Sequence, residues 1–173
     1  MLAVGLLGTA LLLLLFSFSS RGSALTAWFY VLLGQTFIFS GVLMNANDVH
    51  QGEVIHYASG ILISFLLGLY CLYKTKAVDD DITLNKYHGY VYENKVTAVL
   101  FLLAAIGLLG FPVTTAFIGI DVFFTHVESG QAVLIALLAL CFIFVELAAI
   151  RIFLRIYMGP HKKLYHPVAF RSS

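Results

Sequence analysis

The chain has 173 residues, of which 61% are hydrophobic and only 11% are charged, and its mean hydropathy is +0.95. Soluble domains are about half apolar and about a quarter charged, so this composition excludes an ordinary soluble domain. A net charge of +1 excludes an extended basic surface for nucleic acid. The two cysteines lie inside apolar runs without the CxxC or Cys/His spacing of a metal site, so no metal or other cofactor is expected.

Runs of about 20 apolar residues predict transmembrane helices, because that length crosses a hydrocarbon core of about 30 Å. Five such spans are predicted, over about residues 1–18, 24–44, 55–73, 96–127 and 131–158. The first span lacks the basic n-region of a signal peptide, so we expect it to be a retained helix. The fold class predicted is therefore all-α integral membrane, a single domain of five transmembrane helices with a tail over residues 159–173.

The distribution of basic residues predicts the orientation of these spans. Loops between five spans alternate sides, and all ten lysines and arginines then fall on one side: Arg21, Lys74, Lys76, Lys86, Lys95, Arg151, Arg155, Lys162, Lys163 and Arg171. Because basic residues are enriched in cytoplasmic loops, we expect the N-terminus outside and the C-terminus in the cytoplasm. Arg151 and Arg155 lie four residues apart on one helical face, and we expect them to snorkel to the cytoplasmic headgroups.

The fourth span is too long for one straight crossing. Its 32 residues would extend about 48 Å as a continuous helix. Pro112 removes a backbone donor, Gly110 lowers helix propensity, and Thr114 and Thr115 offer hydroxyl partners. We therefore expect a discontinuous helix around residues 110–115. The alternative is an ordinary proline kink in a tilted helix. The residues assigned to the break are Gly110, Pro112, Thr114, Thr115 and Gly119.

Three segments of the sequence resemble one family. "LLGFPVTTAFIGIDVFF" resembles the broken-helix motif of the antiporter-like subunits of respiratory complex I and of the related multisubunit cation/proton antiporters. "HYASGILISFLLGL" resembles the helix that precedes it there, and "AIRIFLRIYMGPH" the basic segment that ends the following helix. The family has two five-helix repeats of opposite orientation, and the second enters from outside with its fourth helix broken. The resemblance implies that this chain corresponds to that second repeat alone.

The sequence differs from this family at two positions where the family has titratable residues that carry protons. Counted from residues 117–119, the channel Lys or Glu of the family falls on Ile120; counted from Pro112, it falls on Asp121. In the third span the lysine of the family falls on Gly60, whereas His56 matches its histidine. Either the titratable group is lost or Asp121 replaces it, and the lysine half of the relay is absent.

Three ionisable residues are candidates for a proton or ion path. Glu146 lies near the middle of the fifth span, Asp121 beyond the break toward the outer surface, and His56 at the start of the third span. A charge in hydrocarbon is costly, so such groups face protein or water. Burial raises the pKa of a carboxyl group toward neutrality, and histidine titrates near neutral pH. Each also has a simpler interpretation, namely an interhelical hydrogen bond, a solvated helix end and an interfacial histidine respectively.

Three further polar residues, Gln35, Thr36 and Ser40, lie at membrane depth in the second span. We expect them to form hydrogen bonds between helices, as polar side chains in membranes commonly do. They are less typical of ligand-binding residues.

The alternatives for a membrane chain of this kind fall into three functional classes. A haem- or quinone-binding subunit would need histidines inside helices, but the six histidines here lie at predicted helix ends, in loops or in the tail. No Ser/His/Asp, phosphate-binding-loop or zinc-hydrolase pattern occurs, so the chain alone is not expected to be an enzyme. The remaining classes are a conducting and a purely structural membrane subunit.

The function predicted is a subunit of a proton- or cation-translocating membrane complex, forming half of an antiporter-like module. The alternative is a structural subunit that kept the antiporter fold without conducting, in a redox-driven or bicarbonate-uptake assembly. The expected partners are the lipid bilayer and other membrane subunits, among them a chain that supplies the first five-helix repeat. The expected location is the cell (inner) membrane.

Overall fold

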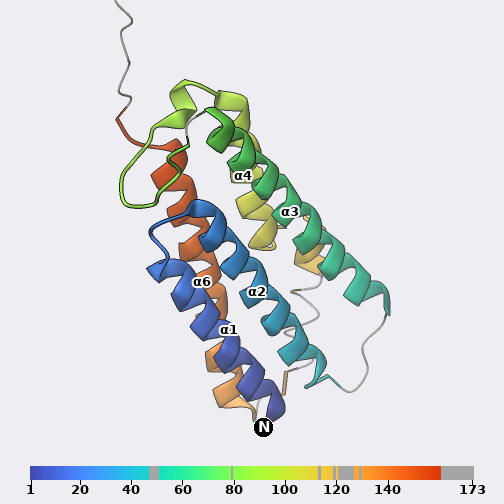
Figure 1. Cartoon of the computed structure of the whole chain (residues 1–173). Coiled ribbons are helices and arrows are strands. Elements are labelled where there is room, and N and C mark those ends of the chain that lie inside the picture. Colours follow the sequence, from blue (N-terminus) through green and yellow to red (C-terminus); the bar gives the residue numbers. More distant parts are fainter. Residues whose placement is uncertain are drawn as a thin grey trace, which may run out of the picture.

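The computed structural model describes residues 1–46, 51–78, 80–112, 114–118, 120, 127–128 and 130–160, and within these ranges it contains helices and no strand. Five α-helices run through the molecule (Figure 1): α1 (Leu2–Ser19), α2 (Ala24–Leu43), α3 (Gln51–Val78), α4 (Lys95–Leu108) and α6 (Ala132–Tyr157). A short 3-10 helix, η1 (Tyr90–Tyr92), precedes α4. Residues 115–118 and 120 are also helical.

Four of these helices, α1, α2, α3 and α6, are long and apolar enough to cross a membrane, in line with the all-α membrane fold expected from the sequence. Helix α4 is apolar but has only 14 residues, about 21 Å of helix, which is short of a hydrocarbon core of about 30 Å. The predicted span over residues 96–127 is therefore not among the four helices of sufficient length.

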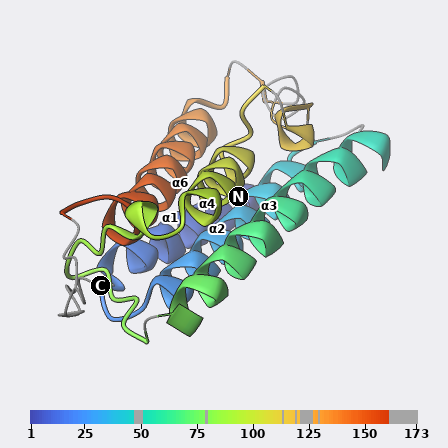
Figure 2. The same ribbon diagram turned by 90° about the horizontal axis from the view of Figure 1, so that it is seen from above.

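The helices form a thin bundle. The closest pairs are α1 with α2, α1 with α6, and α3 with α4 (Figures 1 and 2). Trp28 of α2 connects α2 with the α3–α4 pair. Its indole Nε1 donates to the carbonyl of Phe65 in α3 at 3.1 Å, and its ring packs 5.0 Å from that of Phe101 in α4. Gly68 leaves room for this ring, since a Cβ there would lie 2.3 Å from Trp28.

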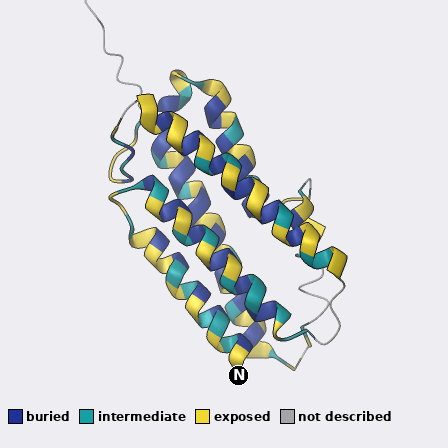
Figure 3. Cartoon of the chain, turned by 45° about the vertical axis from the view of Figure 1, so that its right-hand side comes forward, coloured by how far each residue is buried: buried dark blue, intermediate teal, exposed yellow. Residues whose placement is uncertain are grey.

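Much of the apolar surface lies outside this core. In each of the four long helices, less than half of the most apolar stretch is buried within the protein. Exposed residues therefore follow the outer faces of the helices between buried ones (Figure 3). This surplus of exposed apolar side chains is what a bilayer or a neighbouring membrane subunit would cover.

One end of the bundle carries all the lysines and arginines that the structure describes. This end comprises the α1–α2 turn, the C-terminal ends of α3 and α6, and the segment before α4. Residues 80–94 lie across it, because Leu84 N donates to Arg21 O at 2.8 Å and Gly89 N donates to Met158 O at 3.2 Å. At the opposite end, the side-chain amides of Asn45 and Gln131 exchange two hydrogen bonds of 2.9 and 3.1 Å.

The expected limits of the third span differ from those of α3, and this changes the position of His56 within the helix. Helix α3 begins at Gln51 and ends at Val78, so it is longer at both ends than the predicted span over residues 55–73. Its extra turns contain polar and charged residues such as Glu53 and Lys76, which lie outside the apolar run of the sequence. His56 consequently lies in the second turn of α3 rather than at its start.

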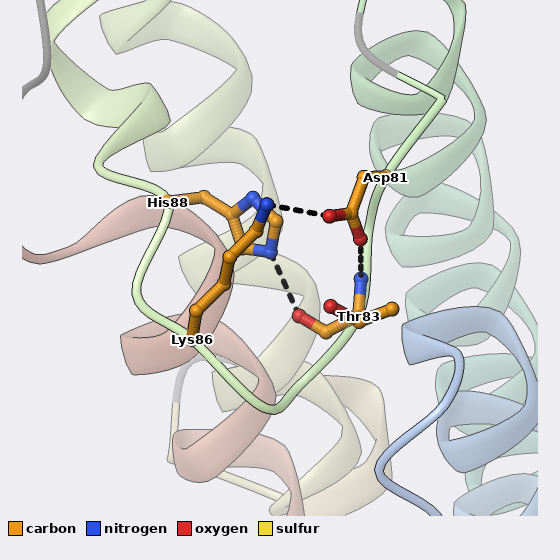
Figure 4. Close-up of polar contacts among 4 residues, drawn as sticks. All are labelled: Asp81, Thr83, Lys86 and His88. Carbon is orange, nitrogen blue, oxygen red and sulfur yellow. Dashed lines mark hydrogen bonds and ion pairs between the residues drawn. The ribbon is translucent and has the colours of Figure 1, made fainter.

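A polar cluster orders the segment between α3 and η1 (Figure 4). The Asp81 carboxylate contacts Lys86 Nζ at 2.5 Å and accepts a hydrogen bond from Thr83 N at 3.1 Å. His88 Nε2 donates to Thr83 O at 2.7 Å, and its ring stacks on that of Tyr90. Asp81 therefore helps to order this segment through its contacts with Lys86 and Thr83.

We predict a small acid-sensitive contribution from Asp81. Hydrogen bonds from Lys86 and then Thr83 lower the pKa of this carboxyl group from 3.8 to about 2. Because the folded pKa is the lower one, the stabilisation is complete above about pH 4 and is lost as the pH falls toward 2. Both side chains are largely solvated, so we expect less than about 1 kcal/mol. Amide hydrogen exchange of Thr83, compared at pH 5 and pH 2.5 with Asp81→Asn as the reference, measures it; equal protection in both proteins would contradict the prediction.

Candidate functional site

The end of α4 leaves a backbone carbonyl without its usual helical donor. The N–H that would bond Leu108 O in a continuing helix belongs to residue 112, which is a proline and has none. In the structure Gln35 of α2 replaces it, because its Nε2 donates to Leu108 O at 2.8 Å. Both residues are buried, with exposed fractions of 1% for Gln35 and 0% for Leu108.

Tyr57 of α3 completes this arrangement. Its hydroxyl donates to Gln35 Oε1 at 2.8 Å, and Tyr57 is itself only 1% exposed. The amide of Gln35 thus receives a bond from one helix and gives one to another. We call Gln35, Tyr57 and the Leu108 carbonyl the amide cluster. It joins α2, α3 and the end of α4 at one buried point, where a missing bond would leave a desolvated polar group.

The backbone around residues 107–116 passes very close to α3. A Cβ on Gly60 would lie 2.4 Å from Ala116 N, and one on Gly107 would lie 2.1 Å from Ser64 Oγ. Gly60 and Ser64 are four residues apart, hence on one face of α3. Small residues at this spacing let helices and backbone approach closely in membranes.

The segment that follows α4 turns at Gly110. This residue has φ +65°, a left-handed conformation in which a side chain is strained, and a Cβ there would also lie 2.0 Å from Ile120 Cδ1. Thr114 Oγ1 donates to Phe111 O at 2.8 Å, so the expected local hydroxyl bond is present. Pro112 and Thr115 are exposed, and helical structure resumes at Thr115.

The three polar residues predicted in α2 behave differently from one another. Gln35 forms the expected interhelical bonds, as described above. Thr36 and Ser40 do not, because their hydroxyls donate to Leu33 O at 2.7 Å and Thr36 O at 2.8 Å within the same helix. An i−3 or i−4 carbonyl is always within reach of a helical Ser or Thr, so no partner on another helix is needed.

The predicted proton-path residues are not brought together with the amide cluster. Glu146 lies on an exposed face of α6. His56 is exposed on α3, and its Nδ1 donates to Gly52 O at 2.5 Å. Asp121, and Gly119 of the predicted break, lie outside the described residues.

The chemistry of the amide cluster is that of a fixed hydrogen-bond network. An amide, a phenol and a carbonyl exchange no proton near neutral pH. The cluster can therefore hold the turn that follows α4 in place, because it gives a buried backbone carbonyl its hydrogen-bond partner. In the part of the chain that the structure describes, no three His, Cys, Asp or Glu side chains come together as a metal site would require.

Sequence reasoning did not identify Tyr57, Gly60 or Ser64 as part of this site. Pro112 is one sequence feature that points to the site, since it identifies the carbonyl four residues earlier as a group that lacks its helical donor. Another is the four-residue spacing of Gly60, Ser64 and Gly68, which predicts a close approach without naming its partner.

We predict that the amide cluster is a measurable source of stability. Gln35→Leu leaves the Leu108 carbonyl and the Tyr57 hydroxyl buried without Gln35, so we expect the free energy of unfolding in detergent to fall by about 1–3 kcal/mol. Tyr57→Phe removes one bond and should cost less, and the double variant should cost less than the sum of the two.

Thr36→Ala is the matched control, since this neighbouring side chain bonds only a carbonyl of its own helix. We expect it to change stability by less than about 0.5 kcal/mol. Thermal and denaturant unfolding followed by circular dichroism give these values. A Gln35→Leu protein as stable as the Thr36→Ala protein would remove the energetic role assigned to the cluster.

Comparison of this chain with protein-family models, with curated proteins and with solved structures finds no match.

Proposed function

We propose that the chain is a subunit of a proton- or cation-translocating membrane complex and forms one five-helix half of an antiporter-like module. In this proposal α4 and the helical residues from 115 onward are two pieces of one discontinuous membrane span. The observation that carries it is the buried Leu108 carbonyl, which Gln35 of α2 holds at 2.8 Å. Broken helices with externally satisfied backbone mark ion and substrate sites in transporters.

Two further observations support a place inside a larger complex. Glu146 is exposed in the middle of an apolar helix, where a carboxylate needs a protein or water neighbour. The resemblance covers one repeat of a family that carries two, so we propose a second chain that supplies the first repeat. The gathering of described cations at one end supports a cytoplasmic C-terminus and an outer N-terminus.

The second candidate is a structural subunit that keeps this fold without conducting, in a redox-driven or bicarbonate-uptake assembly. It is favoured by the residues at the site. Gly60 stands where the family has a lysine, and the amide cluster contains no group that titrates near neutral pH.

Copurification followed by flux measurement tests the proposal. The tagged chain, extracted gently from its native membrane, is expected to bring a second membrane subunit with it, and an obligate interface should bury more than about 2,000 Å² in total. The complex is then reconstituted into liposomes and proton and cation flux recorded. Purification as a stable monomer would contradict the assembly proposal; an intact complex without flux would leave the structural candidate in place.

A further inference from the structure

Three arginines meet around one pocket at the basic end of the bundle. Arg21 lies in the turn between α1 and α2, and Arg151 and Arg155 lie one turn apart in α6. They line a cavity of about 310 Å³ together with Asn85 and Tyr87 of the segment before α4. Among the described residues that line this cavity there is no carboxylate. We call it the arginine pocket.

The guanidinium groups of α6 are held in place by aromatic rings and carbonyls. Arg151 donates to Phe18 O, and its Cζ lies 4.8 Å from the centre of the Phe18 ring. Arg155 Nη1 donates to Asn85 O at 3.5 Å, and its Cζ lies 4.3 Å from the centre of the Tyr87 ring. A ring covers the flat face of a guanidinium and leaves N–H groups on its edge for a ligand.

The arginine pocket brings three positive charges together, and the described residues that line it supply no negative charge. The ion pair recorded within the described residues joins Lys86 and Asp81, and it includes none of the three arginines. Like charges at close range repel, more strongly where protein displaces water. An anion in the pocket would remove this repulsion, and the planar fork of arginine matches the oxygens of a phosphate group.

The surface beside the pocket points to the source of that phosphate. Phe18 and Leu154 both line the pocket and remain 39% and 42% exposed. Apolar side chains continue from them along the outer faces of the two helices, with Leu15 and Ile150 exposed by 41% and 44%. A phosphate seated among the arginines would thus have an apolar surface next to it, which a free phosphate ion does not use and an acyl chain does.

We propose that the arginine pocket binds the headgroup phosphate of an anionic phospholipid whose acyl chains lie along α1 and α6. Basic pockets between transmembrane helices on the cytoplasmic side recognise such headgroups. The inference depends on the membrane location of the chain and not on whether it conducts ions.

Native mass spectrometry of the full chain, with any subunits that copurify, tests this proposal. The probe is phosphatidylglycerol, with phosphatidylcholine of the same acyl chains as the reference lipid. We expect wild type to retain phosphatidylglycerol preferentially. Each arginine removed should lower that preference about fivefold, so the triple variant Arg21→Gln, Arg151→Gln, Arg155→Gln should lose it.

The matched control removes the same charge from the same end of the bundle, outside the pocket: Lys74→Gln, Lys76→Gln, Lys95→Gln. It should keep most of the preference. If the triple arginine variant does not fold, Arg21→Gln alone decides, since Arg21 is exposed and its side chain makes no hydrogen bond recorded among the described residues; about a fivefold loss is expected.

Three outcomes would overturn the proposal. One is a wild-type chain with no preference between the two lipids. Another is an equal loss in the arginine and lysine variants, which would reduce the effect to net charge. The third is displacement of phosphatidylglycerol by inorganic phosphate, which would identify the pocket as a site for free phosphate.

Discussion

Glu146→Gln is expected to lower the flux of the reconstituted complex by at least about tenfold while leaving its subunit content unchanged, because a group that carries protons contributes by factors of this size or more. The neighbours of Glu146 on the outer face of α6 are apolar, with Ile143 and Leu147 exposed by 50% and 47%. A carboxylate among such residues is stabilised only by water or by a polar group of another subunit. The glutamine amide has nearly the same shape as the carboxyl group, but it does not bind and release a proton near neutral pH.

Glu128→Gln is the control for this experiment, since Glu128 is an exposed carboxylate that precedes α6. We expect it to leave flux at the wild-type level. Asp121→Asn should reduce flux by less than, or as much as, Glu146→Gln, because the sequence places Asp121 nearer the outer water. Proton and cation flux in proteoliposomes and subunit content are measured on the same samples.

The outcomes of the Glu146 experiment separate the two candidate functions. Wild-type flux in both Glu146→Gln and Asp121→Asn would favour the structural subunit. Loss of assembly in Glu146→Gln, with Glu128→Gln intact, would make Glu146 a contact between subunits and remove the main support for conduction through this chain.

Gly60→Ala is expected to lower the stability of the protein, although it adds only one methyl group. The new Cβ would lie 2.4 Å from Ala116 N and 2.7 Å from Thr115 Oγ1, and a backbone atom cannot move aside like the end of a flexible side chain. Overpacking of this kind costs about 1–3 kcal/mol or more, which exceeds the gain of up to about 1 kcal/mol that alanine brings to a helix interior.

Gly8→Ala in α1 is the matched control, because a Cβ at Gly8 would meet no described atom within 4 Å. We expect it to be neutral or stabilising by up to about 1 kcal/mol. Unfolding of both variants by heat and by denaturant, in the same detergent, gives the comparison. Similar stabilities for the two proteins would show that α3 and residues 115–116 do not press together at Gly60.

The close approach at Gly60 also bears on one position where the sequence differs from the antiporter-like family that it resembles. A lysine at this position would place its stem against the same backbone atoms, so the absence of lysine agrees with this packing. The resemblance to that family pointed to the missing lysine but not to the packing around Gly60, because the proximity of residues 60 and 116 depends on the folded chain and not on a local sequence pattern.

Features set by local chemistry were predictable from the sequence. Apolar length indicated the membrane helices, and Pro112 with Gly110 indicated where regular α4 ends. Features set by packing between distant segments were not. Gln35 bonds Leu108 and Tyr57, which lie 73 and 22 residues away in the sequence. The contact of Asp81 with Lys86 is local, but it depends on a loop conformation that hydropathy does not encode. The extra turns of α3 were missed because hydropathy measures the apolar part of a helix and not its polar ends.

The bond from Gln35 to Leu108 has a mechanical consequence. In an unbroken helix, a carbonyl is bound to its own chain and moves only with it. Here the final carbonyl of α4 is anchored to α2, and through Tyr57 to α3. A rotation of the turn over residues 109–112 must therefore stretch one side-chain bond worth about 1 kcal/mol, not a whole helical turn. The turn is therefore held by a weak contact that can break and form again, and any displacement of the turn also acts on α2 and α3.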